Sequence, residues 1–213
     1  MARPNLLISV TQQGTDGWKI CRSGRATGSR AKDILAKIKT GEAAARRNYR
    51  TQLVTERLTG SPQESGFVSD AMKWGTEQEP HARRAYEAAT GLIVNEAGFI
   101  YLEEIMTGCS VDGLVEHDGM AEYKCPNSAN HIDWMLAGEL PSEHKAQILH
   151  NLWVTGREWC DFVSYDPRLP ENLQLFIVRY NRIEDEIKAH ESEVLRFLSE
   201  VDEMENRLRK YAA

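Results

Sequence analysis

The order of hydrophobic patterns along the chain predicts an α/β fold, in which a central mixed β-sheet is flanked by helices. Helical periodicity dominates the N-terminal part, short strand-like runs follow, and a long amphipathic segment closes the chain. No repeat or linker divides the 213 residues, a length that suits one well-buried domain. We therefore expect a single domain over 1–213, with a helical part (1–95), a sheet core (96–180) and a C-terminal helix (182–211).

Three helices are expected in the N-terminal part, and the first has Ile34, Leu35 and Ile38 on one face. The first covers 29–39 and the second covers 42–58. Ser69 can cap the third, which runs to about residue 90, because its hydroxyl accepts a bond from a free N–H at the helix start. Gly91 then ends this helix, since glycine readily adopts the left-handed conformation that follows many helices.

Five short apolar runs bounded by turn residues predict the strands of the sheet. They cover 98–102, 110–116, 120–125, 159–165 and 173–180. Asp118-Gly119 predicts a hairpin between the second and third runs. A helix over 142–155, ended by Gly156, separates the third run from the fourth.

The last helix, 182–211, carries apolar residues at heptad-like spacing. We expect this stripe to pack on the body of the protein, and a contact between subunits is the alternative. The charges of this segment differ from those near the N-terminus. Ten basic and two acidic residues lie between positions 19 and 50, whereas nine acidic and five basic residues follow position 183. This polarity is typical of a phosphate-facing surface and a separate solvated or partner-facing one; mere solubility of charged helices is the alternative.

The composition is that of an ordinary globular protein, with 41% hydrophobic and 27% charged residues and a formal net charge of -6. No segment approaches the ~20 apolar residues that cross a bilayer, and no apolar stretch near the N-terminus suits a secretory signal. We therefore expect a cytoplasmic protein with no membrane partner. The four cysteines form no CxxC pair, which predicts small buried side chains rather than zinc ligands or disulfides.

Asp112, Glu122 and Lys124 form the group that is most indicative of chemistry. Glu122 and Lys124 are two apart on an expected strand, so both project from one face. Asp112, on the neighbouring strand of the hairpin, can reach the same point. Burying two carboxylates with one ammonium is costly unless something binds there, and Mg²⁺ prefers carboxylate and carbonyl oxygens. Because Mg²⁺ can polarise a phosphodiester, the group predicts a metal-dependent nuclease; a ladder of alternating surface charges is the alternative.

Short motifs around this group extend over most of the chain. They are Gln13-Gly14-Thr15-Asp16-Gly17-Trp18, Arg22, Ala26-Thr27-Gly28-Ser29, Trp74-Gly75-Thr76-Glu77-Gln78-Glu79, Cys109-Ser110-Val111-Asp112-Gly113-Leu114, Glu122-Tyr123-Lys124-Cys125-Pro126, Ala146-Gln147, Leu152-Trp153-Val154-Thr155 and Tyr165-Asp166-Pro167-Arg168. Each is weak alone, but in this order the sequence resembles the YqaJ viral recombinase family, the phage lambda-type alkaline exonucleases of the PD-(D/E)XK nuclease superfamily. The resemblance implies a restriction-endonuclease-like fold.

The resemblance also implies roles for residues at matching positions. The implied catalytic residues are Asp112, Glu122, Lys124, Glu79 and Gln147. The implied metal ligands are Asp112, Glu122, Glu79 and the backbone carbonyl of Tyr123. For Glu79 a solvated helix carboxylate is the alternative, and for Gln147 a buried structural amide.

The residues implied to bind a 5′-terminal phosphate are Arg22, Ser29 and Ser110. Arginine binds phosphate bidentately, and Ser29 begins an expected helix whose N-terminus favours anions. For Ser29, a plain helix cap is the alternative.

Further DNA contacts are implied at Met72, Lys39 and His131. Met72 falls where the family places an apolar wedge that splits the terminal base pair, with ordinary core packing as the alternative. Lys39 falls near a basic residue that enters the DNA groove. Some relatives carry an arginine shortly after the Cys-Pro pair, where this chain has Ala129-Asn130-His131, so His131 is the expected substitute.

Together these features predict a 5′→3′ exonuclease acting on double-stranded DNA ends in phage-type recombination. It would release 5′-mononucleotides and leave 3′ single-stranded tails, using two Mg²⁺ ions that Mn²⁺ can replace. The resemblance implies a ring-shaped homotrimer and a single-strand annealing protein as partner. A restriction-like or structure-specific endonuclease on the same fold is the first alternative. A nuclease with an iron–sulfur cluster is disfavoured by the dispersed cysteines, and a non-catalytic end-binding protein by the complete acidic and lysine set.

Overall fold

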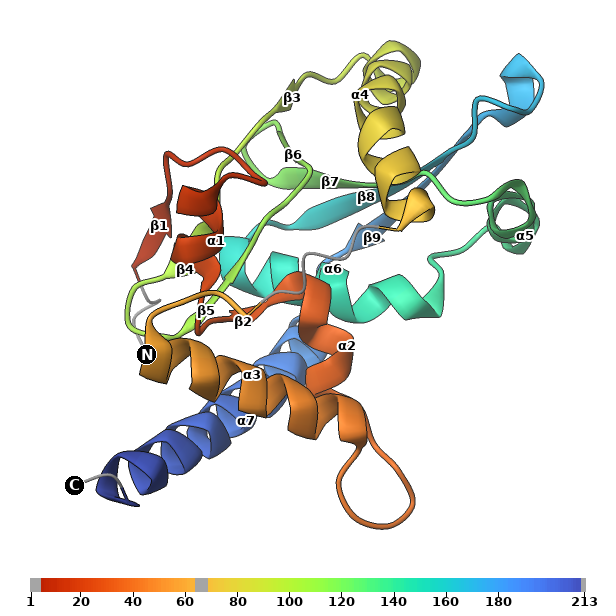
Figure 1. Cartoon of the computed structure of the whole chain (residues 1–213). Helices are drawn as coiled ribbons and strands as arrows, with labels where there is room; N and C mark the ends of the chain where they lie inside the picture. Colours follow the sequence, from red (N-terminus) through yellow and green to blue (C-terminus); the bar gives the residue numbers. More distant parts are fainter. Residues whose placement is uncertain (1–4, 64–68, 212–213) are drawn as a thin grey trace.

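The structure, a computed structural model that describes residues 5–63 and 69–211, contains two mixed sheets rather than one (Figure 1). The smaller sheet has the order β1 (Leu6–Ile8), β4 (Ile100–Leu102), β5 (Thr107–Cys109), β2 (Ala26–Thr27). The larger has the order β3 (Val94–Asn95), β6 (Gly113–Val115), β7 (Gly119–Lys124), β8 (Trp159–Tyr165), β9 (Leu175–Asn181). The expected mixed α/β class with flanking helices is confirmed, although the strands divide between two sheets.

The hairpin of β6 and β7, which the Asp118-Gly119 pair predicts, lies between β3 and β8 in the larger sheet. β7 then pairs in parallel with β8, and β9 returns antiparallel to β8. Every residue of β8 is buried, which suits a central strand covered on both faces. The predicted catalytic residues of β7 therefore lie next to the most buried strand of the sheet.

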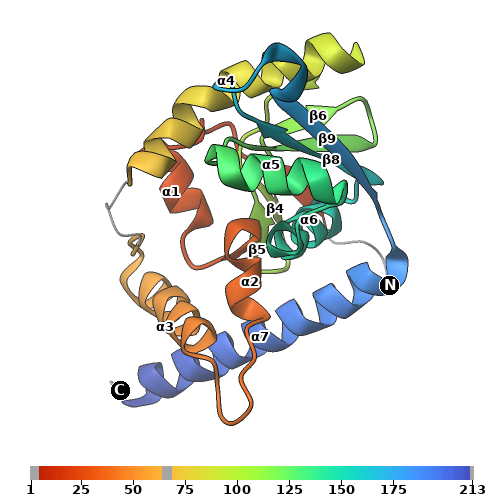
Figure 2. The ribbon, with the colours of Figure 1, turned by 90° about the vertical axis from the view of Figure 1, so that its right-hand side faces the viewer.

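Helices cover both faces of the larger sheet (Figures 1 and 2). α4 (Asp70–Thr90) packs on one face, over a cluster that includes Tyr86 and Tyr123. α6 (Ser142–Thr155) packs on the other, in a larger cluster that includes Met120 and Ile148. Because side chains alternate along β7, its residues contribute in turn to the two clusters.

The ends of α4 confirm the capping predicted from the sequence. The Ser69 hydroxyl accepts a hydrogen bond from the Met72 N–H at 3.2 Å. Gly91 follows the last turn with a φ of 72°, and its N–H donates to the Glu87 carbonyl at 2.9 Å. α3 (Ala44–Thr59) likewise lies within two residues of its expected bounds.

The helix expected over 29–39 is shorter in the structure. It consists of a 3₁₀ turn, Gly28–Arg30, and α2, Ala31–Ile34. Ile34 is 1% exposed, but Ile38 is 56% exposed and has no core to cover. Burial of an apolar face supplies most of the stability of a short helix, so the periodic pattern after Ile34 does not suffice.

The part before residue 96 is also less helical than expected, because β1, β2 and β3 belong to it. Two helices were not predicted, α1 (Asp16–Arg22) and α5 (Ser128–Ala137). β1, β2 and β3 have only two or three residues each, too few for an alternation of apolar and polar residues to be visible in the sequence.

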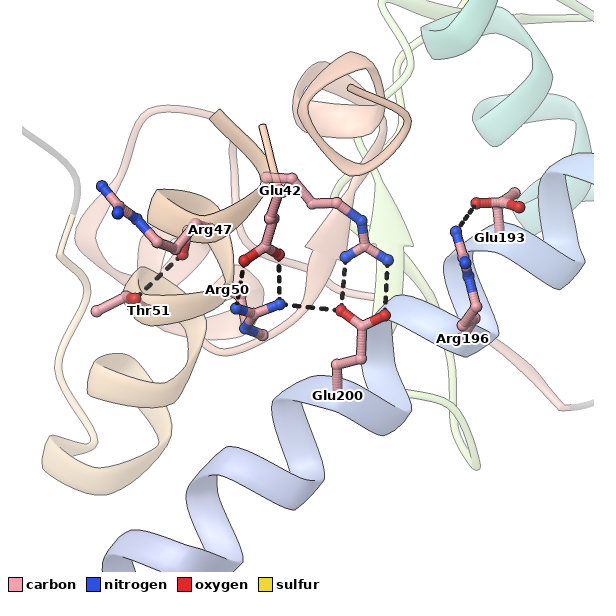
Figure 3. Close-up of polar contacts among 8 residues, drawn as sticks. Glu42, Arg47, Arg50, Thr51, Glu193, Arg196 and Glu200 are labelled. Carbon is pink, nitrogen blue, oxygen red and sulfur yellow. Dashed lines mark hydrogen bonds and ion pairs between the residues drawn. The ribbon is translucent and has the colours of Figure 1, made fainter. Parts of the chain in front are cut away.

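The C-terminal helix α7 (Glu184–Tyr211) packs against α3 and α6, which confirms the expected contact with the body of the protein. Its acidic residues meet basic residues of α3 (Figure 3). Glu200 accepts bonds from Arg46 at 2.7 and 3.0 Å and from Arg50 at 3.0 Å, and Arg50 also pairs with Glu42 at 2.5 Å. The two regions of opposite charge thus partly neutralise each other, which corrects the interpretation that they form separate surfaces. None of the described helices, this one included, is long and apolar enough to cross a membrane.

Candidate active site

Four elements bring the predicted catalytic residues together. Glu122 and Lys124 lie on β7, Glu79 on α4 and Gln147 on α6. Asp112 was expected within a strand, but it occupies the bend just before β6, where the chain leaves the smaller sheet. The bend directs the carboxylate of Asp112 toward β7, so the predicted meeting of the hairpin residues is found one position outside the strand.

The carboxylate of Glu122 is the centre of a hydrogen-bond network. Lys124 Nζ and Gln147 Nε2 each donate to Glu122 Oε1 at 2.5 Å. The contact between Glu122 and Lys124 confirms that the two side chains project from the same face of β7. Glu122 itself is 1% exposed, so its orientation is set by these protein groups rather than by solvent.

Negative charge exceeds positive charge in this cluster. Burial raises the pKa of Asp112 well above its ordinary value, and the nearby Glu122 charge raises it further. Burial and then Glu122 also raise the pKa of Glu79. Burial opposes the charge on Lys124, but Glu122 and Asp112 outweigh it and raise the pKa of this ammonium. One lysine therefore faces three carboxyl groups, an arrangement that a bound cation stabilises.

The donor set fits Mg²⁺ if backbone and water oxygens take part. Within 5–63 and 69–211, no three His, Cys, Asp or Glu side chains converge closely enough to hold a metal by themselves. Tyr123 supplies a further oxygen, because its N–H donates to Asp112 Oδ2 at 2.7 Å, and the N–H and C=O of one strand residue point to the same side. The Tyr123 carbonyl thus faces the gap that Asp112 enters. Carboxylates, a carbonyl and water are the ligands that Mg²⁺ prefers.

The predicted phosphate-binding residues line the same cavity as the catalytic group. This cavity has a volume of about 560 Å³, and its walls include Arg22, Ser29, Ser110, Asp112, Glu122, Lys124, Glu79 and Gln147. The Arg22 guanidinium lies 3.5 Å from Ser29 Oγ and 4.1 Å from the centre of the Trp18 ring. Trp18 Nε1 donates to Ser110 Oγ at 2.9 Å. Trp18 therefore positions two members of the group, a role that the sequence did not reveal.

Ser29 does not cap a helix in the way expected. It lies inside the 3₁₀ turn, whose N-cap residue is Thr27, and only four α-helical residues follow. So short a helix has a weak dipole, since few peptide units are aligned. Any affinity of this corner for anions must come from Arg22 and the hydroxyl groups.

Of the three further residues predicted to contact DNA, Met72 and Lys39 are exposed. Met72 is 56% exposed and lines the cavity, which excludes core packing for this side chain. Lys39 is exposed in the loop after α2 and lies outside the cavity walls. Both remain predictions as DNA contacts.

His131 is wrongly predicted as a DNA contact. It is 0% exposed on α5, and its ring nitrogens bond to Ser164 Oγ at 2.7 Å and the Leu173 carbonyl at 2.9 Å. A buried histidine with both nitrogens engaged holds α5 on the sheet. The exposed cation near the Cys-Pro pair is instead Arg168, which donates to the Pro126 carbonyl at 2.7 Å and covers the ring of Trp74.

Asn151 is a site residue that the sequence analysis missed. It lies one turn beyond Gln147 on α6, is 1% exposed, and donates to Glu122 Oε2 at 3.3 Å. The spacing of four residues on a helix was the available signal, because it places Gln147 and Asn151 on one face.

With this geometry established, comparisons with known proteins identify the family. The model of the YqaJ-like viral recombinase domain matches residues 17–158. The chain belongs to this family. The matched residues include the predicted phosphate-binding residues Arg22, Ser29 and Ser110 and the predicted catalytic residues Asp112, Glu122 and Lys124.

Solved structures of exonucleases are similar to the structure of this chain. An alkaline exonuclease from Laribacter hongkongensis (LHK-Exo) is 41% identical, with a TM-score of 0.84 over 93% of this chain and 98% of that one. The same enzyme in complex with dAMP gives 42% identity and a TM-score of 0.85, over equal shares of the chains. A phage related exonuclease from Haemophilus somnus 129PT shares the fold, with 14% identity and a TM-score of 0.65 over 89% and 96%. No curated protein matches the chain.

Proposed function

We propose that the protein is a 5′→3′ exonuclease that acts on double-stranded DNA ends. The supporting observation is that one cavity of about 560 Å³ holds both the Asp112, Glu122 and Lys124 group and the Arg22, Ser29 and Ser110 corner. A cavity of this size accommodates a small ligand such as a nucleotide. A terminal phosphate in the corner would place the adjoining phosphodiester near the carboxylates. The activity of the similar alkaline exonuclease supports the same reaction.

The mechanism follows from what each side chain can donate or accept. Asp112, Glu122, Glu79 and the Tyr123 carbonyl would hold two Mg²⁺ ions, which Mn²⁺ can replace; the chemistry that the ions supply is polarisation of the phosphodiester. Lys124 stabilises the negative charge that develops on the phosphoryl oxygens. Gln147 keeps Glu122 in place through the bond to Oε1.

The polarity of digestion follows from the corner. If Arg22 and Ser29 hold the 5′-phosphate, hydrolysis of the next phosphodiester would release a 5′-mononucleotide. Water adds to the phosphorus, the 3′-oxygen of the terminal nucleotide leaves as a hydroxyl, and the strand keeps a new 5′-phosphate. The complementary strand remains as a 3′ single-stranded tail. Such tails suit phage-type recombination, in which a single-strand annealing protein would be the partner.

We propose a ring-shaped homotrimer around DNA as the working form. The chain has a net charge of -6, which disfavours tight electrostatic binding to a polyanion. A closed ring retains DNA by topology and so compensates for weak attraction.

Digestion of linear duplexes with 5′-phosphate or 5′-hydroxyl ends, with and without Mg²⁺, tests the proposal. We expect mononucleotide release only with Mg²⁺, and at least about tenfold faster from phosphorylated ends, since charged hydrogen bonds to phosphate contribute about 1.5–3 kcal/mol each. Covalently closed circular duplex is the matched control and should remain intact. Cutting of the circle would contradict the exonuclease and favour the structure-specific endonuclease instead.

A further inference from the structure

Asn151 fixes one oxygen of the central carboxylate. Its Nδ2 donates to Glu122 Oε2 at 3.3 Å, while Lys124 and Gln147 share Oε1. The carboxylate plane of Glu122 is thus held at both ends by groups on β7 and α6. A change in the position of the Asn151 amide must alter the direction in which Glu122 Oε2 points.

The other end of the Asn151 amide contacts the phosphate-binding corner. Asn151 Oδ1 is buried and lacks a hydrogen-bond partner within the described part of the chain. It packs on Gly28 so closely that a Cβ at this glycine would lie 2.2 Å from it. Gly28 immediately precedes Ser29, so the Asn151 amide directly contacts the residue next to this corner.

We propose that Asn151 is a positioning residue that couples occupancy of the 5′-phosphate corner to the orientation of Glu122; this inference rests on the proposed function. A phosphate that binds Arg22 and Ser29 fixes the position of the 3₁₀ turn. Gly28, in this turn, then fixes the position of the Asn151 amide, and the amide orients the carboxylate of Glu122. A terminal phosphate then accelerates cleavage in addition to strengthening binding. Selectivity arises in the transition state, where it affects kcat.

Coupling of this kind is reciprocal in equilibrium binding. If a phosphate in the corner orients Glu122 for Mg²⁺, then Mg²⁺ must strengthen binding of the phosphorylated end by the same factor. The effect should disappear when Asn151 is removed, whereas the direct bonds from Arg22 and Ser29 should persist without metal. Binding without metal therefore measures the direct bonds from Arg22 and Ser29, and kcat measures the coupling through Asn151.

The test is a double-mutant cycle with Gly28→Ala, Asn151→Ala and the double variant. For each protein, kcat and KM are measured on duplexes with 5′-phosphate and 5′-hydroxyl ends. Metal-free binding of both duplexes is measured by fluorescence anisotropy. We expect each single variant to lower the ratio of kcat values between the two ends by about tenfold, with metal-free binding within about twofold. The double variant should be no worse than Asn151→Ala, because non-additivity marks residues that act through one another.

Gly119→Ala is the matched control, since a Cβ there would meet the Trp159 ring at 2.0 Å, in the hairpin away from the cavity. It should lower thermal stability and leave the ratio of kcat values unchanged. If Gly28→Ala does not fold, Asn151→Ser, which keeps a small hydroxyl donor, replaces it and should retain more of the ratio than Asn151→Ala.

Three outcomes would overturn the inference. The first is that Asn151→Ala lowers kcat equally on duplexes with 5′-phosphate and 5′-hydroxyl ends. The second is that Asn151→Ala binds the duplexes more weakly in the absence of metal. The third is that the effects of the two single variants on the ratio of kcat values multiply in the double variant. A parent enzyme that leaves both linear duplexes intact would overturn the proposed function itself. A parent that prefers phosphorylated ends, with variants that keep this preference, would overturn the coupling alone.

Discussion

Two of the regions in which the described charged side chains gather differ in how their charges are balanced. Between α3 and α7, Glu200 lies between Arg46 and Arg50, so each charge has an opposite partner. In the cavity, Asp112 and Glu122 share one lysine, and the pKa of Asp112 is raised by burial and by Glu122. Paired charges hold two helices together, whereas the unbalanced charges of the cavity are expected to favour a bound cation.

The same comparison explains why a stretch rich in one sign of charge does not by itself reveal which surface it forms. The arginines of α3 and the acids of α7 are about 150 positions apart, and their pairing becomes visible only when the helices pack. A basic stretch that suggested a nucleic-acid surface proves to be partly structural. The predictions below test the comparison, from the largest expected effect to the smallest.

Removing the lysine that faces the carboxylates of the cavity should have the largest effect. Lys124→Ala is expected to lower kcat by about 10²–10³-fold, because a positioned charge that stabilises a transition state contributes on this scale. Release of mononucleotides from a linear duplex measures the loss, and circular dichroism checks that the fold is retained. Activity within threefold of the parent would show that the unbalanced cluster is not catalytic.

Removing the central anion of the paired region should affect stability instead. Glu200→Gln leaves Arg46, whose side chain is 8% exposed, without a carboxylate. We expect a loss of about 1–3 kcal/mol in the free energy of unfolding, since a stranded buried charge is costly and Glu200 is partly solvated. Thermal denaturation should show a Tm lower by several degrees, with exonuclease rates within twofold of the parent. A large loss of activity at normal stability would contradict the distinction between the regions.

A buried histidine pair between α6 and α7 makes this part of the molecule sensitive to acid. His150 Nδ1 lies 3.1 Å from His190 Nε2, and burial lowers the pKa of His190 to about 4. Because the folded pKa lies below the unfolded value of about 6.5, the stabilisation is complete above pH 6.5 and is lost as the pH falls toward 4. We expect unfolding free energy to fall by about 1–2 kcal/mol between pH 7 and pH 5. His190→Gln should reduce this dependence, and an unchanged slope would refute the assignment.

Relieving the repulsion in the cavity should stabilise the metal-free protein. Asp112→Asn removes one of the three carboxylate charges and is expected to raise stability by about 1 kcal/mol at neutral pH, or roughly 2–4 °C in Tm. The same variant should be inactive. Adding Mg²⁺ to the parent should close the gap in Tm between the two proteins. A less stable Asp112→Asn protein would mean that Asp112 is held mainly for its bond to the Tyr123 N–H.

The smallest effect is expected at an exposed ion pair of α7. Arg196 pairs with Glu193 one turn away, and its side chain is 57% exposed (Figure 3). Arg196→Ala should change unfolding free energy by no more than about 0.5 kcal/mol, since solvent screens such pairs. Chemical denaturation provides the measurement. A loss as large as that of Glu200→Gln would show that pairing alone, without burial, stabilises the α3–α7 region.

Local patterns predicted the parts of the fold whose signals lie close together in the sequence. Ser69 and Gly91 fixed α4, and the Asp118-Gly119 turn fixed the hairpin that brings Glu122 near Asp112. β2 could not be predicted, because its two residues pair with β5 some 80 positions later. Asn151 was missed for a similar reason, since its importance depends on how α6 docks over Glu122. His131 was misassigned because burial cannot be read from a residue type that occurs both inside and outside proteins.

The hydrogen bond from the Tyr123 N–H to Asp112 makes formation of the site depend on how β7 folds. β7 is a structural strand that also carries the predicted catalytic side chains, and its register pairs Glu122 with Phe162 and Lys124 with Ser164. A slip of one residue would turn both side chains to the opposite face of the sheet. A chain that has collapsed without the correct strand register therefore carries no assembled cutting centre. Nuclease activity should therefore appear during refolding only after β7 and β8 have paired in this register.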